Sequence, residues 1–176
     1  MLFIGTSDDI KSSIDIYTNT DLRKGQLYNV DLNEYIGFQF NPTSFEWSRE
    51  VKWSEQNWVG NVNGGDIQFI NIGPRRIELE LLYIADPRAP KVDYRSDYRI
   101  IDTGGLVDFQ AIRDTLEKWE HLIDGLKRPS RVGIVVGVNA FEGVIINTTF
   151  RITEFFEDLT PKEALVLLEF REWLPL

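Results

Sequence analysis

The chain has 176 residues, a length that suits a single domain with a sizeable hydrophobic core. Apolar residues make up 43% of the sequence and aromatic residues 12%, which excludes intrinsic disorder and favours packed β-structure. The formal net charge of −9 argues against a general phosphate-binding surface, and the complete lack of cysteine excludes disulfide bonds and thiolate metal sites.

The sequence contains one histidine, His121, which excludes a His-based metal cluster and a relay between two imidazoles. No apolar run approaches the ~20 residues of a membrane span, and the N-terminus lacks the basic flank and apolar core of a signal peptide. We therefore expect a chain that folds in the cytoplasm, without a membrane anchor and without a cofactor.

The first part of the chain contains three predicted strands. Residues 1–25 have the least regular pattern, and we treat them as an N-terminal extension. Residues 26–30 and 35–40 are predicted to form a hairpin that ends before Pro42, because proline cannot donate to a central ladder. Residues 45–53 alternate apolar and polar side chains, which is the period of a strand.

The middle of the chain is dominated by one strong strand. Residues 54–72 are polar with glycine turns, and we interpret them as a long excursion between two strands. Residues 75–84 alternate more regularly than any other stretch, and Pro74 and Arg75 are predicted to shape the entry to that strand. Residues 86–105 are polar without a period, which indicates a long surface connection.

One helix is predicted over residues 107–123. Its apolar residues recur at spacings of three and four, and therefore form a stripe on one face. Asp108 lies at the N-cap, and Gly125 suits the position after the end. The stripe consists of Phe109, Ile112, Leu116, Trp119 and Ile123.

Three further strands follow the helix, over residues 131–138, 141–156 and 164–173, with a turn at 159–163 between the last two. Strands, one helix and three more strands, without βαβ alternation, predict an α+β fold that is mostly antiparallel. The terminal hairpin is long for a monomeric domain.

The sequence offers few candidates for catalysis. Glu78 with Glu80, or Glu154 with Glu157, are conceivable acid–base pairs, but carboxylates on an alternating strand are more often its solvated face. His121 lies off the apolar stripe of the helix and is expected at the surface. We therefore expect a protein that is not an enzyme.

Two other features suggest binding. Trp47, Trp53 and Trp58 are conceivable as a sugar-stacking platform, although anchoring in a core or an interface fits their strand spacing better. The segment 93–99 alternates charged and aromatic residues, which suits an interface and a solvated loop about equally.

An ordered series of motifs resembles the contractile injection system tube family, the small tube-like baseplate proteins of contractile phage tails and related particles. Its members carry, in this order, an FNP-type turn, a strand ending in Trp, a Gly-Gly loop, a QF pair and a G-x-PR motif before an alternating strand. The corresponding segments here are Phe38–Thr43, Val51–Trp53, Gly64–Gly65, Ile67–Phe69 and Gly73–Tyr83.

The resemblance covers roughly residues 26–173, so we expect a tail-tube-like domain over residues 26–176. It implies two packed antiparallel sheets that approach a barrel, with one helix alongside. It also implies a homo-hexameric ring between the spike-bearing hub and the tail tube, in the baseplate of a virion tail. The partners would be the hub or spike protein, the tail tube protein and another tube initiator, with DNA only passing through the lumen.

Within that ring we expect the residues between the two central strands to contact neighbouring subunits. Many relatives carry a LysM module after the tube domain, whereas this chain stops at Leu176, which favours a plain tube initiator. A carbohydrate-binding β-sandwich that uses the tryptophans remains the alternative. The interface candidates are Trp53, Trp58, Gly64, Gly65, Phe69, Pro74 and Arg75.

Overall fold

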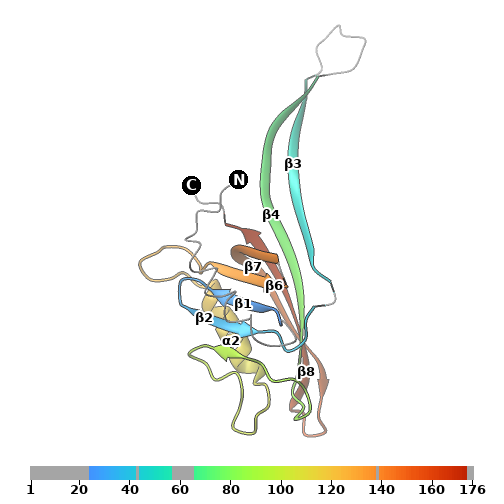
Figure 1. The fold of residues 1–176 in the computed structure, drawn as a ribbon, viewed down its shortest axis with the longest axis vertical. Helices are drawn as coiled ribbons and strands as arrows, with labels where there is room; N and C mark the ends of the chain where they lie inside the picture. The colour runs from blue at the N-terminus through green and yellow to red at the C-terminus, as the bar shows by residue number, and fades with distance from the viewer. Residues whose placement is uncertain (1–23, 43, 57–65, 138, 174–176) are drawn as a thin grey trace.

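A computed structural model describes residues 24–42, 44–56, 66–137 and 139–173. Within these ranges the chain forms eight strands and one helix (Figure 1). Residues 1–23 of the predicted extension lie outside the described residues. The elements are β1 (Gln26–Asn29), β2 (Glu34–Gly37), β3 (Glu46–Gln56), β4 (Asp66–Ile84), β5 (Tyr94–Arg95), α2 (Phe109–Glu120), β6 (Val132–Val136), β7 (Asn139–Phe155) and β8 (Pro161–Glu172).

All eight strands belong to one antiparallel sheet with the order β3-β4-β8-β7-β6-β1-β2-β5. This confirms the α+β, mostly antiparallel class and the predicted β1–β2 hairpin. The resemblance implied two packed antiparallel sheets that approach a barrel, and the backbone hydrogen bonds join the described strands into one continuous sheet.

The long strand β7 explains how one sheet encloses a core. Its first residues pair with β6 and the remainder pairs with β8, and Gly143 has partners on both sides, Val132 and Glu172. A Cβ at Gly143 would lie 2.3 Å from the carbonyl oxygen of Arg171, so only glycine fits this close approach. On the two sides of β7 the strands run in different directions, β8 and β4 along the molecule and β1, β2 and β6 across it (Figure 1).

The core lies between these two parts of the sheet and α2. The alternation predicted for residues 75–84 is confirmed, because every second side chain of β4 from Ile77 to Tyr83 is buried and pairs with a buried residue of β8. The apolar stripe of α2 packs into the same cluster. The strand contributions are Ile77, Leu79, Leu81 and Tyr83 from β4 and Ala164, Val166, Leu168 and Phe170 from β8, each at most 2% exposed.

The helix has its predicted N-cap, begins two residues after the predicted start and ends earlier than predicted. Asp108 is the N-cap and accepts hydrogen bonds from the backbone N–H groups of Gln110 and Ala111. The last helical residue is Glu120 rather than Ile123, because the chain turns back at once. Ile123 donates its N–H to the carbonyl of Arg128 in that turn, 3.0 Å away.

Two other boundaries differ from expectation. The last hairpin turns before Pro161, which is the first residue of β8, a position where proline's missing N–H is tolerated. The connection at 86–105 is only partly at the surface, since Val92 and Ile100 are buried in the core and Tyr94–Arg95 adds a short strand beside β2. Sequence pattern missed this burial because the apolar residues there are isolated.

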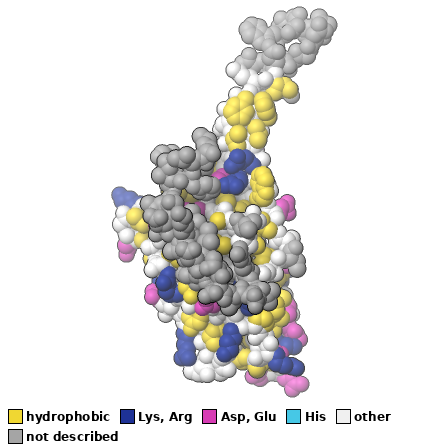
Figure 2. Space-filling model, in the orientation of Figure 1, with side chains coloured by type: hydrophobic (Ala, Val, Ile, Leu, Met, Phe, Trp, Pro, Cys, Tyr) yellow, Lys and Arg dark blue, Asp and Glu magenta, His cyan; other side chains and the backbone are white. Residues whose placement is uncertain are grey.

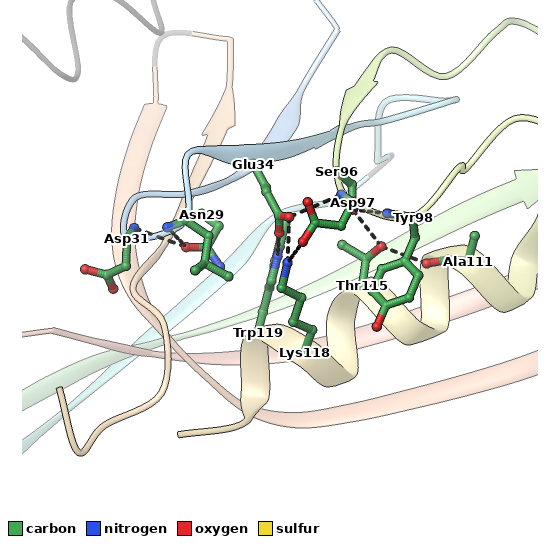
Figure 3. A network of polar contacts seen from close by, with 11 residues as sticks. Asn29, Asp31, Glu34, Ser96, Asp97, Tyr98, Ala111, Thr115, Lys118 and Trp119 are labelled. Atoms are coloured by element: carbon green, nitrogen blue, oxygen red, sulfur yellow. Dashed lines mark hydrogen bonds and ion pairs between the residues drawn. The ribbon is translucent and has the colours of Figure 1, made fainter. Parts of the chain in front are cut away.

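A buried carboxylate attaches α2 to the sheet (Figure 3). Glu34 on β2 is 5% exposed, and its Oε2 accepts a hydrogen bond of 2.8 Å from the indole Nε1 of Trp119. Its Oε1 accepts from Lys118 Nζ at 2.8 Å and from the backbone N–H of Asp97 at 3.2 Å. One side chain thus joins β2, the helix and the loop before the helix.

A second carboxylate performs a similar task after the helix. Asp31, in the β1–β2 turn, accepts two hydrogen bonds from the guanidinium of Arg128, at 2.8 and 3.0 Å, and one from the backbone N–H of Arg131 at 2.8 Å. Burial raises the pKa of Asp31, but these hydrogen bonds and the two arginine charges outweigh it, so the pKa lies below its ordinary value.

We expect Glu34→Ala to lower the free energy of unfolding by about 2–3 kcal/mol, because it leaves the buried Trp119 N–H without its acceptor and removes the ion pair to Lys118. Urea denaturation measures this change. The matched control is Asp97→Asn, which removes the exposed partner of the same lysine and should cost less than about 1 kcal/mol. Equal stability of the two variants would contradict the role of Glu34.

Candidate functional site

The most prominent described feature is the arm, which we define as residues 51–56 of β3 and 66–72 of β4 (Figure 1). The arm projects from the rest of the described molecule, which we call the body. The sequence predicted an irregular excursion over 54–72, and this is wrong at both ends, because 54–56 extend β3 and 66–72 begin β4. Between the pairs Lys52–Asn71 and Trp53–Phe69, Ile70 is an extra residue on β4, and it interrupts the period of two there, which hides the start of β4 from pattern analysis.

One face of the arm is apolar. The register places Val51 opposite Ile72 and Trp53 opposite Phe69, and such cross-strand partners project from the same face. Figure 2 shows hydrophobic side chains gathered along the described part of the arm. The exposed apolar set is Val51, Trp53, Ile67, Phe69, Ile70 and Ile72, with exposed fractions between 42% and 65%.

This apolar face continues the core face of the sheet. Closer to the body, Trp47 lies opposite Ile77, which is 2% exposed and belongs to the hydrophobic core. Ile72, a few residues earlier on the same strand, is 50% exposed. Apolar patches of this kind are uncommon on monomers and mark interaction surfaces.

The aromatic pair on the arm is held in a defined arrangement. The rings of Trp53 and Phe69 are 5.4 Å apart and inclined by 77°, an edge-to-face contact worth about 0.5–1.5 kcal/mol beyond its buried area. The opposite face of the ribbon carries polar pairs, Lys52 with Asn71 and Ser54 with Gln68. The arm is therefore amphipathic, with one face suited to a partner and the other to water.

The structure brings together some of the predicted interface residues. Trp53 and Phe69 are in contact on the arm. Trp58, Gly64 and Gly65 lie outside the described residues, so their predicted roles stay predictions.

The entry role predicted for Pro74 and Arg75 is wrong, because β4 begins at Asp66 and both residues lie within it. They lie at the point where the ladder is irregular. Arg49 pairs with Arg75 and Val51 with Ile72, so the single residue between them on β3 faces both Gly73 and Pro74 on β4. A bulge of this kind tolerates a proline inside a strand.

Sequence reasoning missed the ion cluster at this point, which we call the root cluster: Arg49, Arg75 and Glu172. Glu172 Oε1 accepts from Arg75 Nε at 2.8 Å and Nη2 at 2.6 Å, and its Oε2 accepts from the backbone N–H of Arg75 at 2.9 Å. Arg49 Nη2 lies 3.3 Å from Oε2. The three residues come from β3, β4 and the end of β8, so their spacing in the sequence gives no signal.

The electrostatics of the root cluster favour an ionised carboxylate. Burial raises the pKa of Glu172, but hydrogen bonds from the side chain and backbone of Arg75 and the charges of Arg75 and Arg49 outweigh it, so the pKa lies below its ordinary value of 4.5. The two arginines face each other across the ladder and would repel without this counter-charge.

The four carboxylates considered for catalysis are all exposed in the structure. Glu78 and Glu80 are exposed on the outer face of β4, and Glu154 pairs with Lys162 at 2.8 Å. His121 is exposed at the end of α2, beside a shallow hollow of about 380 Å³. Among the described residues, no three or more His, Asp or Glu side chains form a group that could hold a metal ion.

The other two binding features differ in outcome. Trp47 and Trp53 are both exposed on the apolar face of β3, about 20 Å apart along the strand, while Trp58 lies outside the described residues. In the 93–99 segment, charged groups are used within the chain. Arg95 lies over the ring of Tyr35, 5.5 Å from its centre, and Asp97 binds Lys118. This favours a structural role for the segment.

No protein-family model matches the chain, and no curated protein matches it. In the described part of the chain, no helix is long and apolar enough to cross a membrane.

We expect Glu172→Gln to reduce stability at neutral pH and to flatten its acid dependence. Since the folded pKa of Glu172 is lowered, its contribution is present above about pH 4.5 and is lost as pH falls through the folded pKa. Urea unfolding over a series of acidic buffers measures this. Glu80→Gln, an exposed carboxylate of β4, serves as control and should keep the wild-type profile. A wild-type slope in Glu172→Gln would contradict the assignment.

Proposed function

We propose that the chain is a structural, non-enzymatic subunit of a contractile injection system: a tube initiator that forms a homo-hexameric ring between the spike hub and the tail tube. It would act in the baseplate of a virion tail, after assembly in the host cytoplasm. The observation that carries the proposal is the arm, whose apolar face continues the core face of the sheet and is left uncovered. Such a face is stabilised when another subunit covers it.

The geometry of the arm supports a closed ring over a two-fold dimer. The arm projects from one end of the sheet, and in the proposed ring it lies against the body of the next subunit, which is a different surface from the arm itself. Contacts between unlike surfaces are heterologous, and they generate rings when the rotation closes. β3 is also an edge strand of eleven residues, which leaves backbone groups for a neighbouring chain.

The outer face of the sheet supports a role as a channel lining. Glu46, Glu78 and Glu169 are direct neighbours across β3, β4 and β8, which places three carboxylates in one row. Like charges opposite each other destabilise a sheet, and Arg76 with Arg171 in the next row of the same face offsets part of that cost. In a channel, carboxylates of this kind would repel passing DNA and prevent tight binding of phosphates.

We expect the double variant Trp53→Ser, Phe69→Ser to lose self-association while the body stays folded, because both side chains are exposed in the single chain. Light scattering, on the protein alone and with the other baseplate proteins, measures the mass. The wild type should reach six chains of 20.4 kDa each, about 122 kDa, and the variant should remain a monomer.

The control is Leu122→Ser, which removes an apolar side chain of 69% exposure far from the arm and should assemble as the wild type does. Thermal unfolding of all three proteins separates a loss of assembly from a loss of folding. A wild type that stays monomeric alone and with partners would overturn the ring proposal, and an assembling double variant would remove the arm from it.

The second candidate function is carbohydrate binding. The observation in its favour is that Trp47 and Trp53 are exposed on one strand face, where sugar rings are able to stack. Under this alternative a monodisperse monomer binds glycans on an array, and Trp47→Ala abolishes the signal. Absence of glycan binding by the wild type would retire it.

A further inference from the structure

The arm leaves the body as an unsupported two-stranded ribbon. Within the body β4 is paired on both sides, with β3 and with β8, and the last β4–β8 partners are Arg76 and Arg171. Beyond them β4 keeps only its pairing with β3. Two-stranded ribbons twist strongly and are only marginally stable on their own, so the direction of the arm has to be fixed at this exit.

The ladder is weakest at the same place. Glu50 on β3 faces two residues of β4, Gly73 and Pro74, and proline supplies no N–H to the ladder. A bulge bends the strand that carries it and leaves one residue unpaired. The exit therefore has the properties of a hinge: a bend, an interrupted ladder and no third strand.

Glu172 spans this hinge from the end of β8. Its side chain is 10% exposed and contacts both strands of the ribbon, β4 through Arg75 and β3 through Arg49. One of its bonds goes to the backbone N–H of Arg75, the residue directly after Pro74. Arg75 is further held over the ring of Phe141 on β7, 5.7 Å from its centre.

We propose that Glu172 is the positioning residue of the arm: by clamping Arg49 and Arg75 across the bulge, it sets the direction in which the arm leaves the body. The inference holds whether or not the chain forms a ring, since it concerns one chain. The carboxylate does what a third strand would otherwise do, by tying the ribbon to the sheet with charge-assisted hydrogen bonds.

The absence of cysteine from the sequence permits a direct test. Asn71→Cys on the arm and Thr149→Cys on the outer face of β7 introduce two cysteines, and each is modified with a spin label. Pulsed electron–electron double resonance then gives the distribution of distances between the two labels. Labelled protein is diluted with an excess of unlabelled protein, so that only distances within one chain are measured.

In the labelled protein that keeps Glu172, we expect a distance distribution with one narrow peak. Glu172→Gln should lose that narrow peak and give a broad distribution, and Glu172→Asp, which keeps the charge, should restore most of it. Arg75→Met is a milder second variant, because it keeps the backbone bond to Glu172, and it should broaden the distribution as well.

Glu34→Gln is the matched control. The Glu34 side chain is 7% exposed, close to the 10% of Glu172, and it also accepts from a cationic side chain, Lys118, and from a backbone N–H, that of Asp97. It lies on β2, which is separated from β4 by β8, β7, β6 and β1 in the sheet order. Glu34→Gln should lower the melting temperature and leave the arm distance unchanged. The proposal is overturned if Glu172→Gln and Arg75→Met keep the narrow peak, or if Glu34→Gln broadens it to the same extent.

Discussion

The pairing of β8 with β4 on one side and β7 on the other holds this structure together. The core-face side chains of β8 are almost completely buried, and each pairs with a buried residue of β4. Through β7 the same sheet continues to β6, β1 and β2, so one set of strands encloses the core on two sides. β8 ends at Glu172, and beyond this point β4 no longer has β8 beside it. The apolar face of β4 is buried in the core before this point and exposed on the arm.

Three carboxylates stabilise the junctions that this arrangement creates. Glu34 attaches the helix to β2, Asp31 attaches the segment after the helix to the β1–β2 turn, and Glu172 attaches the arm to the end of β8. Each accepts hydrogen bonds from a cationic side chain and from a backbone N–H. Mostly buried charges with such partners are costly to leave unpaired, so they act as fixed points between elements that share few apolar contacts.

The sequence predicts the class of the fold and most of its elements because alternation and the helical stripe are local properties. It names Trp53 and Phe69 among the interface candidates, and their contact was found only in the structure. It failed where the period is broken: the extra residue Ile70 concealed the start of β4, and isolated buried residues such as Ile100 concealed the packing of the long connection. The root cluster could not be predicted from the sequence, because Glu172 is distant in the chain from both Arg49 and Arg75.

The arm as an assembly surface is the idea on which the proposed function depends. Electron microscopy of the purified protein, in end-on views, tests this idea most directly. The hub protein is added if the chain alone is monomeric. We expect closed rings with six-fold symmetry in which each arm lies against the body of the next subunit. Rings with the arms pointing freely into solvent, or open and irregular assemblies, would contradict it.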